Sequence, residues 1–334
     1  MQTSYQPTFS APLASPPSHS LCPILSGPTA CGKTGFSIEF AQQHSIEIIN
    51  ADSLLVYRDF DIGTAKPTAA EQSGVPHHLI DICDPLENFS AADFVNQARS
   101  MIAQIESRGK RALIVGGTPF YLKALCFGVW EAPATHPEFR STLEPFTSEE
   151  LHARLTSRDP KRADDIHPSD RYRVIRALEI LEFSSFQTHE EMLAQSSPLQ
   201  PNPLFPLLWI DRDHAELESR IQIRTQEMLK HGFVDEVIRL QNQFPGARAL
   251  NSVGYRQVCD YLAERAPSGR KIRPGTAGLA DEIQLATRQL VKSQRTFLKG
   301  LTRNLGDRLA RRFVLNQERS ELERALVELY SPSS

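Results

Sequence analysis

Eight consecutive residues near the start of the chain constrain its fold more than any other feature. They are Gly27, Pro28, Thr29, Ala30, Cys31, Gly32, Lys33 and Thr34, a full match to the pattern G-x-x-x-x-G-K-[ST]. An apolar run at 24–26 predicts a buried strand before them, and Phe36, Phe40 and Ala41 share one face of the helix expected after them. Glycines let backbone N–H groups curl around phosphate oxygens, and the helix N-terminus adds its dipole. The sequence therefore predicts a strand–loop–helix unit that binds a chain of phosphates.

Apolar segments that alternate with helical patterns predict a parallel α/β sheet. The strand candidates are residues 23–26, 46–50, 112–115 and 207–210. Helical patterns lie between or after them, at 91–108, 215–229, 233–241 and 281–300. Alternation of this kind gives a P-loop NTPase-like sheet with helices on both faces. Ligands of such sheets bind beyond the carboxyl ends of the strands, so residues that follow strands are site candidates.

The character of the chain changes from about residue 130. The stretch that follows is polar, helical in period and ends in a Pro- and Ser-rich cluster. We therefore predict a core made of 21–129 and 204–315, an all-helical insertion at 130–203, a disordered leader at 1–20 and a C-terminal tail at 316–334.

Composition excludes several classes of protein. The 334 residues are 40% hydrophobic and 23% charged, as in soluble globular proteins, and no apolar run reaches the about 18 residues of a membrane helix. The first 20 residues lack the basic start and apolar core of a signal peptide. The five cysteines are scattered without a C-x-x-C pair, which favours reduced thiols in a cytoplasm over a zinc module.

Polar residues follow two of the predicted strands. Asp52 comes just after 46–50, where a carboxylate either accepts a proton from a bound nucleophile or caps the next helix. Gly116, Gly117 and Thr118 come just after 112–115, where two glycines permit close approach to a ligand or form a simple turn. Asp211 follows the fourth strand but is too weak a candidate to be assigned to a metal.

Basic residues cluster in two regions of the predicted helices. Arg220 and Arg224 are four apart, so both can reach one anion or lie together on a solvated face. The stretch 251–312 carries 13 Lys or Arg against five Asp or Glu. Such a stretch is either a surface for a polyanion or a solvated helical face. Arg288, Lys292, Arg295 and Lys299 form its basic stripe, which would suit a nucleic-acid backbone beside a phosphate site.

Taken together, these segments resemble the tRNA dimethylallyltransferases, also called tRNA isopentenyltransferases. The motifs that carry the resemblance are the phosphate-binding loop, 51–57, 61–67, 76–81, 116–118, 166–170, 253–257 and 287–290. The run Asp-Ile-Gly-Thr-Ala-Lys-Pro at 61–67 is much more specific than the loop. This chain departs from the family pattern at Pro119, Phe120, Ser169 and Ser293, and the lack of a late C-x-x-C pair resembles the bacterial members.

The resemblance implies a reaction. The family moves a dimethylallyl group from dimethylallyl diphosphate to N6 of the adenosine 3′-adjacent to the tRNA anticodon, and releases diphosphate. By this resemblance residues 27–34 hold the diphosphate, Thr34 binds the cofactor Mg2+, and Asp52, Thr118 and Arg224 are catalytic. Asp52 would accept the N6 proton, while Lys33 and Arg224 would stabilise the leaving group.

The resemblance also implies contacts with the anticodon stem-loop of tRNA. The residues concerned are Ser53, Leu54, Leu55, Arg140, Tyr172, Arg173, Arg176, Gly254, Tyr255, Arg256, Lys292, Gln294 and Arg295. We expect a cytoplasmic monomer with no membrane partner. Three alternatives stay open: an adenylate isopentenyltransferase, an ATP-binding small-molecule kinase, and a nucleotide-dependent RNA-binding switch. The insertion and the basic stretch favour tRNA over a free adenylate.

Overall fold

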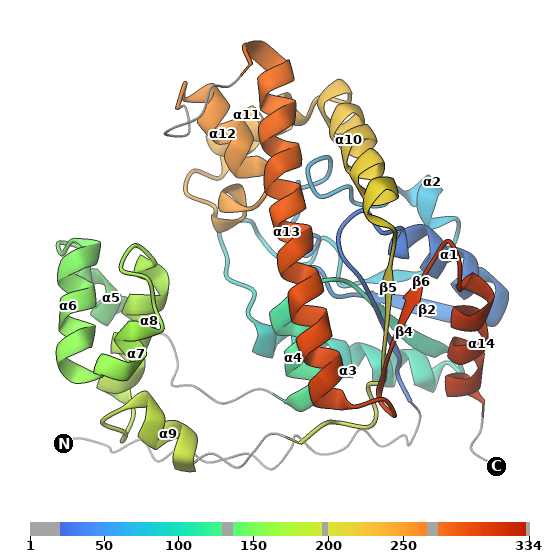
Figure 1. Cartoon of the computed structure of the whole chain (residues 1–334), viewed down its shortest axis with the longest axis horizontal. Coiled ribbons are helices and arrows are strands. Elements are labelled where there is room, and N and C mark those ends of the chain that lie inside the picture. The colour runs from blue at the N-terminus through green and yellow to red at the C-terminus, as the bar shows by residue number, and fades with distance from the viewer. Residues whose placement is uncertain (1–20, 129–135, 196–199, 266–272, 332–334) are drawn as a thin grey trace. The chain divides into compact units, whose positions relative to one another are not determined.

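The computed structural model of the chain describes residues 21–128, 136–195, 200–265 and 273–331 (Figure 1). These residues divide into two compact units. The smaller contains 136–195 and Gln200, and the larger contains all the others. The sequence prediction placed the insertion at 130–203. Within the described residues, no helix is both long and apolar enough to cross a membrane.

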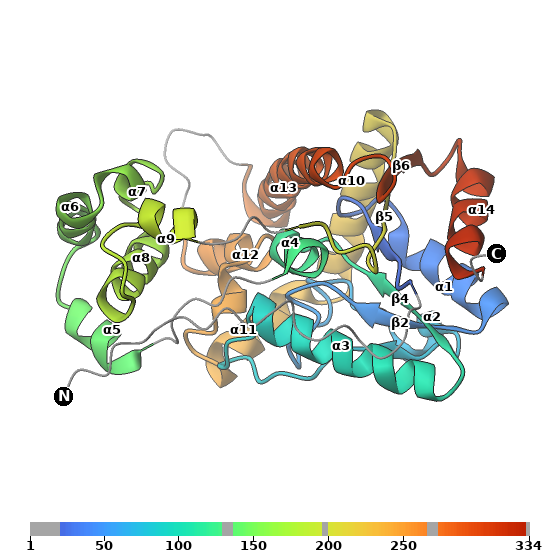
Figure 2. The same ribbon diagram turned by 90° about the horizontal axis from the view of Figure 1, so that it is seen from below.

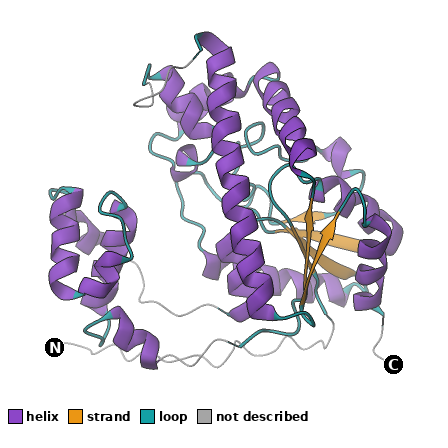
Figure 3. Cartoon of the chain, in the orientation of Figure 1, coloured by secondary structure: helices purple, strands orange, loops and turns teal. Residues whose placement is uncertain are grey.

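The larger unit is built on a wholly parallel sheet (Figure 3). In sheet order its described strands are β3 (His77–His78), β2 (Ile46–Asn50), β4 (Arg111–Val115), β1 (Ile24–Ser26), β5 (Leu207–Asp211) and β6 (Ala310–Val314). The four strands predicted from apolar runs are confirmed. Strand β6 was missed because Arg311 and Arg312 are exposed in its middle and interrupt the apolar run.

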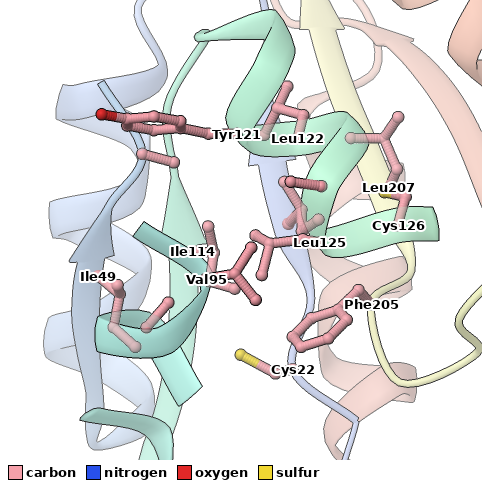
Figure 4. Close-up of a cluster of buried hydrophobic side chains, with 14 of the residues drawn as sticks. Cys22, Ile49, Val95, Ile114, Tyr121, Leu122, Leu125, Cys126, Phe205 and Leu207 are labelled. Atoms are coloured by element: carbon pink, nitrogen blue, oxygen red, sulfur yellow. The ribbon is translucent and has the colours of Figure 1, made fainter. Parts of the chain in front are cut away.

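Successive residues of the central strands pack on opposite faces of this sheet. Ile24 and Ile114 face a core formed with α3 (Ala91–Ser107), α4 (Pro119–Phe127) and the C-terminal half of α13 (Gly275–Leu305). Figure 4 shows Val95 of α3 and Leu125 of α4 beside Ile114 of β4.

The neighbouring residues Leu25 and Leu113 face the other core. That core is formed with α1 (Lys33–His44), α10 (His214–Lys230) and α14 (Arg319–Tyr330). Figure 2 shows α13, α4 and α3 on one side of the sheet, with α1 and α14 on the other. The predicted cover of helices on both faces is therefore confirmed.

A third core lies beyond the carboxyl ends of the strands. It joins α11 (Phe233–Gln243), α12 (Tyr255–Leu262) and the N-terminal half of α13 to the loop that follows β2. Figure 1 shows α11 and α12 beside the end of α13 that lies away from the sheet. A short helix, α2 (Ala69–Gln72), follows the loop and is held by a capping box at Thr68.

The smaller unit has a hydrophobic core of its own. Its helices are α5 (Pro137–Leu143), α6 (Ser148–Arg158), α7 (Pro160–Asp164), α8 (Arg171–Phe183) and α9 (His189–Gln195). Leu151, Leu155 and Val174 are fully buried in this core, and Thr147 begins α6 with a capping box. The all-helical character expected of the insertion holds for the described residues.

The predicted C-terminal tail needs a correction, because it contains a packed helix. Residues 319–330 form α14, whose Leu322, Ala325 and Leu326 are buried against the same core as α1. Their spacing of three and four residues places them on one helix face, a signal that the sequence prediction did not use. The predicted leader, 1–20, lies outside the described residues.

Candidate active site

The phosphate-binding loop joins β1 to α1, the position that the sequence predicts. Gly32 has φ 96° and caps α1, a left-handed conformation that favours glycine. At Gly27 a Cβ atom would lie 2.4 Å from the Ile210 carbonyl oxygen, so a side chain has no room there. Lys33 is half-buried and its Nζ donates to the Pro28 carbonyl at 3.3 Å. The ammonium group is therefore folded back over the loop, where an anion would bind.

Two arginines hold the loop from outside. Arg212 follows β5 and donates through Nε to the Cys31 carbonyl at 2.6 Å. Arg220 on α10 donates through Nε to the Ala30 carbonyl at 2.8 Å. Sequence reasoning paired Arg220 with Arg224 but gave no role to Arg212, because a single arginine after a strand carries no spacing signal.

Asp52 and Thr118 lie together where β2 and β4 end. A Cβ atom at Gly116 would lie 2.2 Å from the Ala51 carbonyl oxygen, so the two strand ends touch through their backbones. The Thr118 hydroxyl accepts from the Ser53 N–H at 2.9 Å and donates to Ser53 Oγ at 3.3 Å. Asp52 is half-buried, and its Oδ1 accepts from the Leu54 N–H at 2.9 Å. These contacts fix a carboxylate and a hydroxyl at one edge of the sheet.

Arg224 completes this edge from α10. Its side chain is half-buried, and one guanidinium nitrogen donates to the Thr64 carbonyl at 3.1 Å. Burial lowers the pKa of Arg224, while the charge of Asp52 raises it. The guanidinium is thus close enough to Asp52 for their charges to interact, and the site holds one anionic and one cationic side chain.

A buried carboxylate holds the loop that presents Thr64. Glu236 on α11 accepts from the backbone N–H groups of three consecutive residues: Asp61 at 3.1 Å, Ile62 at 2.7 Å and Gly63 at 3.1 Å. Its side chain is only 6% exposed. The loop is the start of the specific motif at 61–67, so this motif is folded around Glu236. Sequence reasoning missed Glu236, which looks like any acidic residue in the first turn of a helix.

The side chain of Tyr255, one of the residues implied to contact tRNA, turns into the core. Tyr255 is fully buried and its hydroxyl donates to Glu236 Oε1 at 2.7 Å. Burial and the Glu236 carboxylate both raise the pKa of this phenol. Gly254 is buried as well, whereas Arg256 is exposed. Of these three residues only Arg256 is exposed. An aromatic ring packed in a core, as in Tyr255, cannot also face a partner.

Two more of the implied tRNA contacts lie against the site itself. Gln294 is 9% exposed and binds the phosphate-binding loop. Arg295 donates to Asp211 Oδ1 at 2.6 and 2.9 Å and to the Arg212 carbonyl at 2.7 Å. Burial alone would raise the pKa of Asp211, but hydrogen bonds from Arg295 and Arg312 keep it lowered. Lys292 on the same helix is exposed.

In the smaller unit, too, some of the residues implied to contact tRNA pair with a buried carboxylate, while others are exposed. Arg140 and Arg176 both pair with Glu179, whose side chain is fully buried. Burial opposes ionisation of Glu179, but these partners lower its pKa to about 2. Tyr172 and Arg173 are exposed on α8. Ser53, Leu54 and Leu55 of the larger unit are half-buried, and Ser53 is hydrogen-bonded to Thr118.

A magnesium ion would find few protein ligands here. Within the described residues, no three His, Cys, Asp or Glu side chains group together as a metal site. Thr34, the second residue of α1, is exposed and directly follows Lys33. Mg2+ commonly keeps several waters and takes substrate phosphate oxygens with one or two protein ligands. The donor set therefore fits an ion that arrives with a diphosphate.

The family model for IPP transferase matches residues 55–301. The chain belongs to the IPP transferase family. The match begins after the phosphate-binding loop and includes the motif at 61–67, the helix that carries Arg224 and most of α13.

Individual relatives agree with this assignment. The chain is 43% identical over 278 residues to a tRNA dimethylallyltransferase of Synechococcus sp., which covers 83% of this chain and 86% of the relative. It is 40% identical over 287 residues to that of Chromobacterium violaceum, with coverage of 83% and 86%. A solved tRNA isopentenylpyrophosphate transferase from Bacillus halodurans is 30% identical, with a TM-score of 0.64 and coverage of 93% and 97%. A eukaryotic dimethylallyltransferase acting on tRNA shares the fold, with a TM-score of 0.74 at 23% identity and coverage of 92% and 78%.

Proposed function

We propose that this chain transfers the dimethylallyl group from dimethylallyl diphosphate to N6 of the adenosine 3′-adjacent to the anticodon of tRNA, releasing diphosphate. The observation that carries the proposal is the meeting of three strand ends: the phosphate-binding loop after β1, Asp52 after β2 and Thr118 after β4. Membership of the IPP transferase family and the names of the relatives support tRNA as the acceptor and a dimethylallyl compound as the donor.

The chemistry follows from the charges at this edge. The N6 lone pair forms a bond to C1 of the dimethylallyl group as the C1–O bond breaks and its electrons pass to diphosphate. Asp52 takes the N6 proton, so the product leaves as a neutral amine. Lys33, the loop N–H groups and Arg224 stabilise the negative charge that develops on diphosphate. No ATP is consumed in this scheme, because the loop grips the leaving group.

Thr34 would hold Mg2+ through its hydroxyl, together with diphosphate oxygens and water. When bound, the ion neutralises part of the charge on the leaving group. Thr118 acts on the other reactant. Its hydrogen bonds with Ser53 fix the segment that ends in Leu54 and Leu55, against which the adenine would bind.

The target base must leave its stack to reach Asp52, and single-stranded loops of RNA permit this most readily. We assign tRNA contacts to the basic or aromatic side chains that are exposed: Arg256 and Lys292 in the larger unit, and Tyr172 and Arg173 in the smaller. Such residues bind the phosphate backbone in a salt-dependent way.

The experiment offers dimethylallyl diphosphate labelled in its prenyl group, with Mg2+, to unmodified tRNA and to AMP in parallel. We expect label in tRNA, at the adenosine beside the anticodon. Label in AMP alone would replace the proposal with an adenylate isopentenyltransferase. No label in either would refute prenyl transfer. The remaining functions would then be a small-molecule kinase and an RNA-binding switch, and only the kinase would transfer phosphate from ATP.

A further inference from the structure

Gln294 differs from its neighbours on α13. Lys292 and Ser293 are exposed, while the Gln294 side chain turns inward and is 9% exposed. Its Oε1 accepts from the Thr29 backbone N–H at 2.9 Å, and its Nε2 donates to the Gly117 carbonyl at 3.4 Å. One side-chain amide therefore joins the phosphate-binding loop to the glycine pair after β4.

The orientation of this amide is determined by its partners. Thr29 offers an N–H, which needs an oxygen, and Gly117 offers a carbonyl, which needs a donor. A glutamine flipped by 180° would place donor against donor and acceptor against acceptor. Both bonds bridge segments far apart in sequence, so they hold tertiary positions that local structure does not set.

Gly117 shows how little space surrounds the bridge. A Cβ atom there would lie 3.1 Å from Gln294 Nε2, 3.1 Å from the Gly27 carbonyl oxygen and 3.8 Å from Lys33 Nζ. The Gln294 amide and the Lys33 ammonium group thus both lie within 4 Å of the position that a Cβ atom of Gly117 would take. A substitution at Gln294 therefore alters the phosphate-binding loop directly and leaves the exposed face of α13 unchanged.

We propose that Gln294 is a positioning residue for the diphosphate, holding the Thr29 end of the loop at a fixed distance from Gly117 before the ligand arrives. The identity of the anion rests on the proposed function. A loop ordered in advance loses less conformational freedom on binding, so the tether raises affinity for the diphosphate. By this account the Gln294 side chain does not bind tRNA, whereas Lys292, two residues earlier, does.

The test compares Gln294→Met with Lys292→Met as a matched control on the same helix. Both variants replace a polar side chain by an unbranched apolar one of similar length. Calorimetry measures binding of inorganic diphosphate with Mg2+, and separately of an unmodified anticodon stem-loop RNA. We expect Gln294→Met to weaken diphosphate binding about tenfold, as the loss of its hydrogen bonds with Thr29 and Gly117 implies, with RNA affinity changed less than twofold. Lys292→Met should show the opposite pattern.

A second comparison separates positioning from general destabilisation. Gly117→Ala also crowds the bridge. Adding Gln294→Met to the Gly117→Ala variant should therefore weaken diphosphate binding much less than Gln294→Met does in the wild-type protein. Additive losses would mean that Gln294 only stabilises the fold and would overturn the inference. So would a Gln294→Met protein that loses RNA affinity but keeps diphosphate affinity. Wild-type protein that bound no diphosphate would refute the proposed function itself.

Discussion

Replacing Tyr255 by phenylalanine tests whether the motif at 253–257 supports the site from within. The hydroxyl donates to Glu236 at 2.7 Å, and the ring is fully buried among Phe60 and Phe233. The substitution removes one of the four hydrogen bonds that Glu236 accepts and adds no bulk. Because hydrogen bonds to charged groups contribute about 1.5–3 kcal/mol, we expect the free energy of unfolding to fall by about 2 kcal/mol.

We expect Tyr255→Phe to change ligand binding at the site less than it changes the free energy of unfolding. Glu236 keeps its three backbone donors in Tyr255→Phe, so Thr64 still presents its carbonyl to Arg224. Glu236→Ala removes the acceptor altogether and leaves the N–H groups of 61–63 and the Tyr255 hydroxyl without it. At about 1–3 kcal/mol for each buried group, the loss should exceed about 4 kcal/mol, and diphosphate affinity should fall with it.

Equilibrium urea unfolding and filter binding of an anticodon stem-loop RNA are the assays. Tyr261→Phe is the matched control, since Tyr261 lies on the same helix but is 39% exposed. It should change the free energy of unfolding by less than about 0.5 kcal/mol. Should Tyr255→Phe leave stability unchanged and weaken RNA binding instead, the phenol contacts RNA and the reasoning from burial is refuted.

Three further predictions concern the strand ends, the smaller unit and the metal. Gly116→Ala should reduce prenyl transfer at least tenfold, because its Cβ would collide with the Ala51 carbonyl and displace Asp52; an unchanged rate would mean that the strand ends do not need this contact. Glu179→Gln should destabilise the protein by about 3 kcal/mol at pH 7, since it removes the buried negative charge with which Arg140 and Arg176 form ion pairs. Because the folded pKa of Glu179 is depressed from 4.5 to about 2, this stabilisation is complete above pH 4.5 and should disappear as the pH falls towards 2, which unfolding curves across that range would check. Removing Mg2+ with a chelator should abolish transfer but leave RNA binding within twofold, and transfer that persists without divalent ions would remove Thr34 from its proposed role.

The parts of the site that could be predicted from sequence are those with a local signal. The phosphate-binding loop is contiguous, and Asp52 and Thr118 each follow an apolar strand directly. Parallel strands end at one edge of their sheet, so these residues had to meet there once the strands were identified. Arg224 could be placed because its helix follows another core strand.

The parts that could not be predicted are contacts between segments distant in sequence. Glu236 binds a loop 173 to 175 residues earlier, and Gln294 binds Thr29 across 265 residues. No spacing rule indicates which face of a helix will meet such a loop. The resemblance identified Tyr255 and Gln294 as important, but only the packing shows that their side chains turn inward. Importance and exposure are separate properties, and sequence alone gave only the first.

The most direct test of the central claim is the single-turnover rate of Asp52→Asn with an anticodon stem-loop and dimethylallyl diphosphate both bound. Asparagine keeps an oxygen to accept from the Leu54 N–H, so the fold and RNA affinity should be unchanged. It cannot take the N6 proton, and we predict a rate lower by about 10²- to 10⁴-fold. A rate within threefold of the wild type would contradict the account, since the carboxylate at the end of β2 would then not be the base.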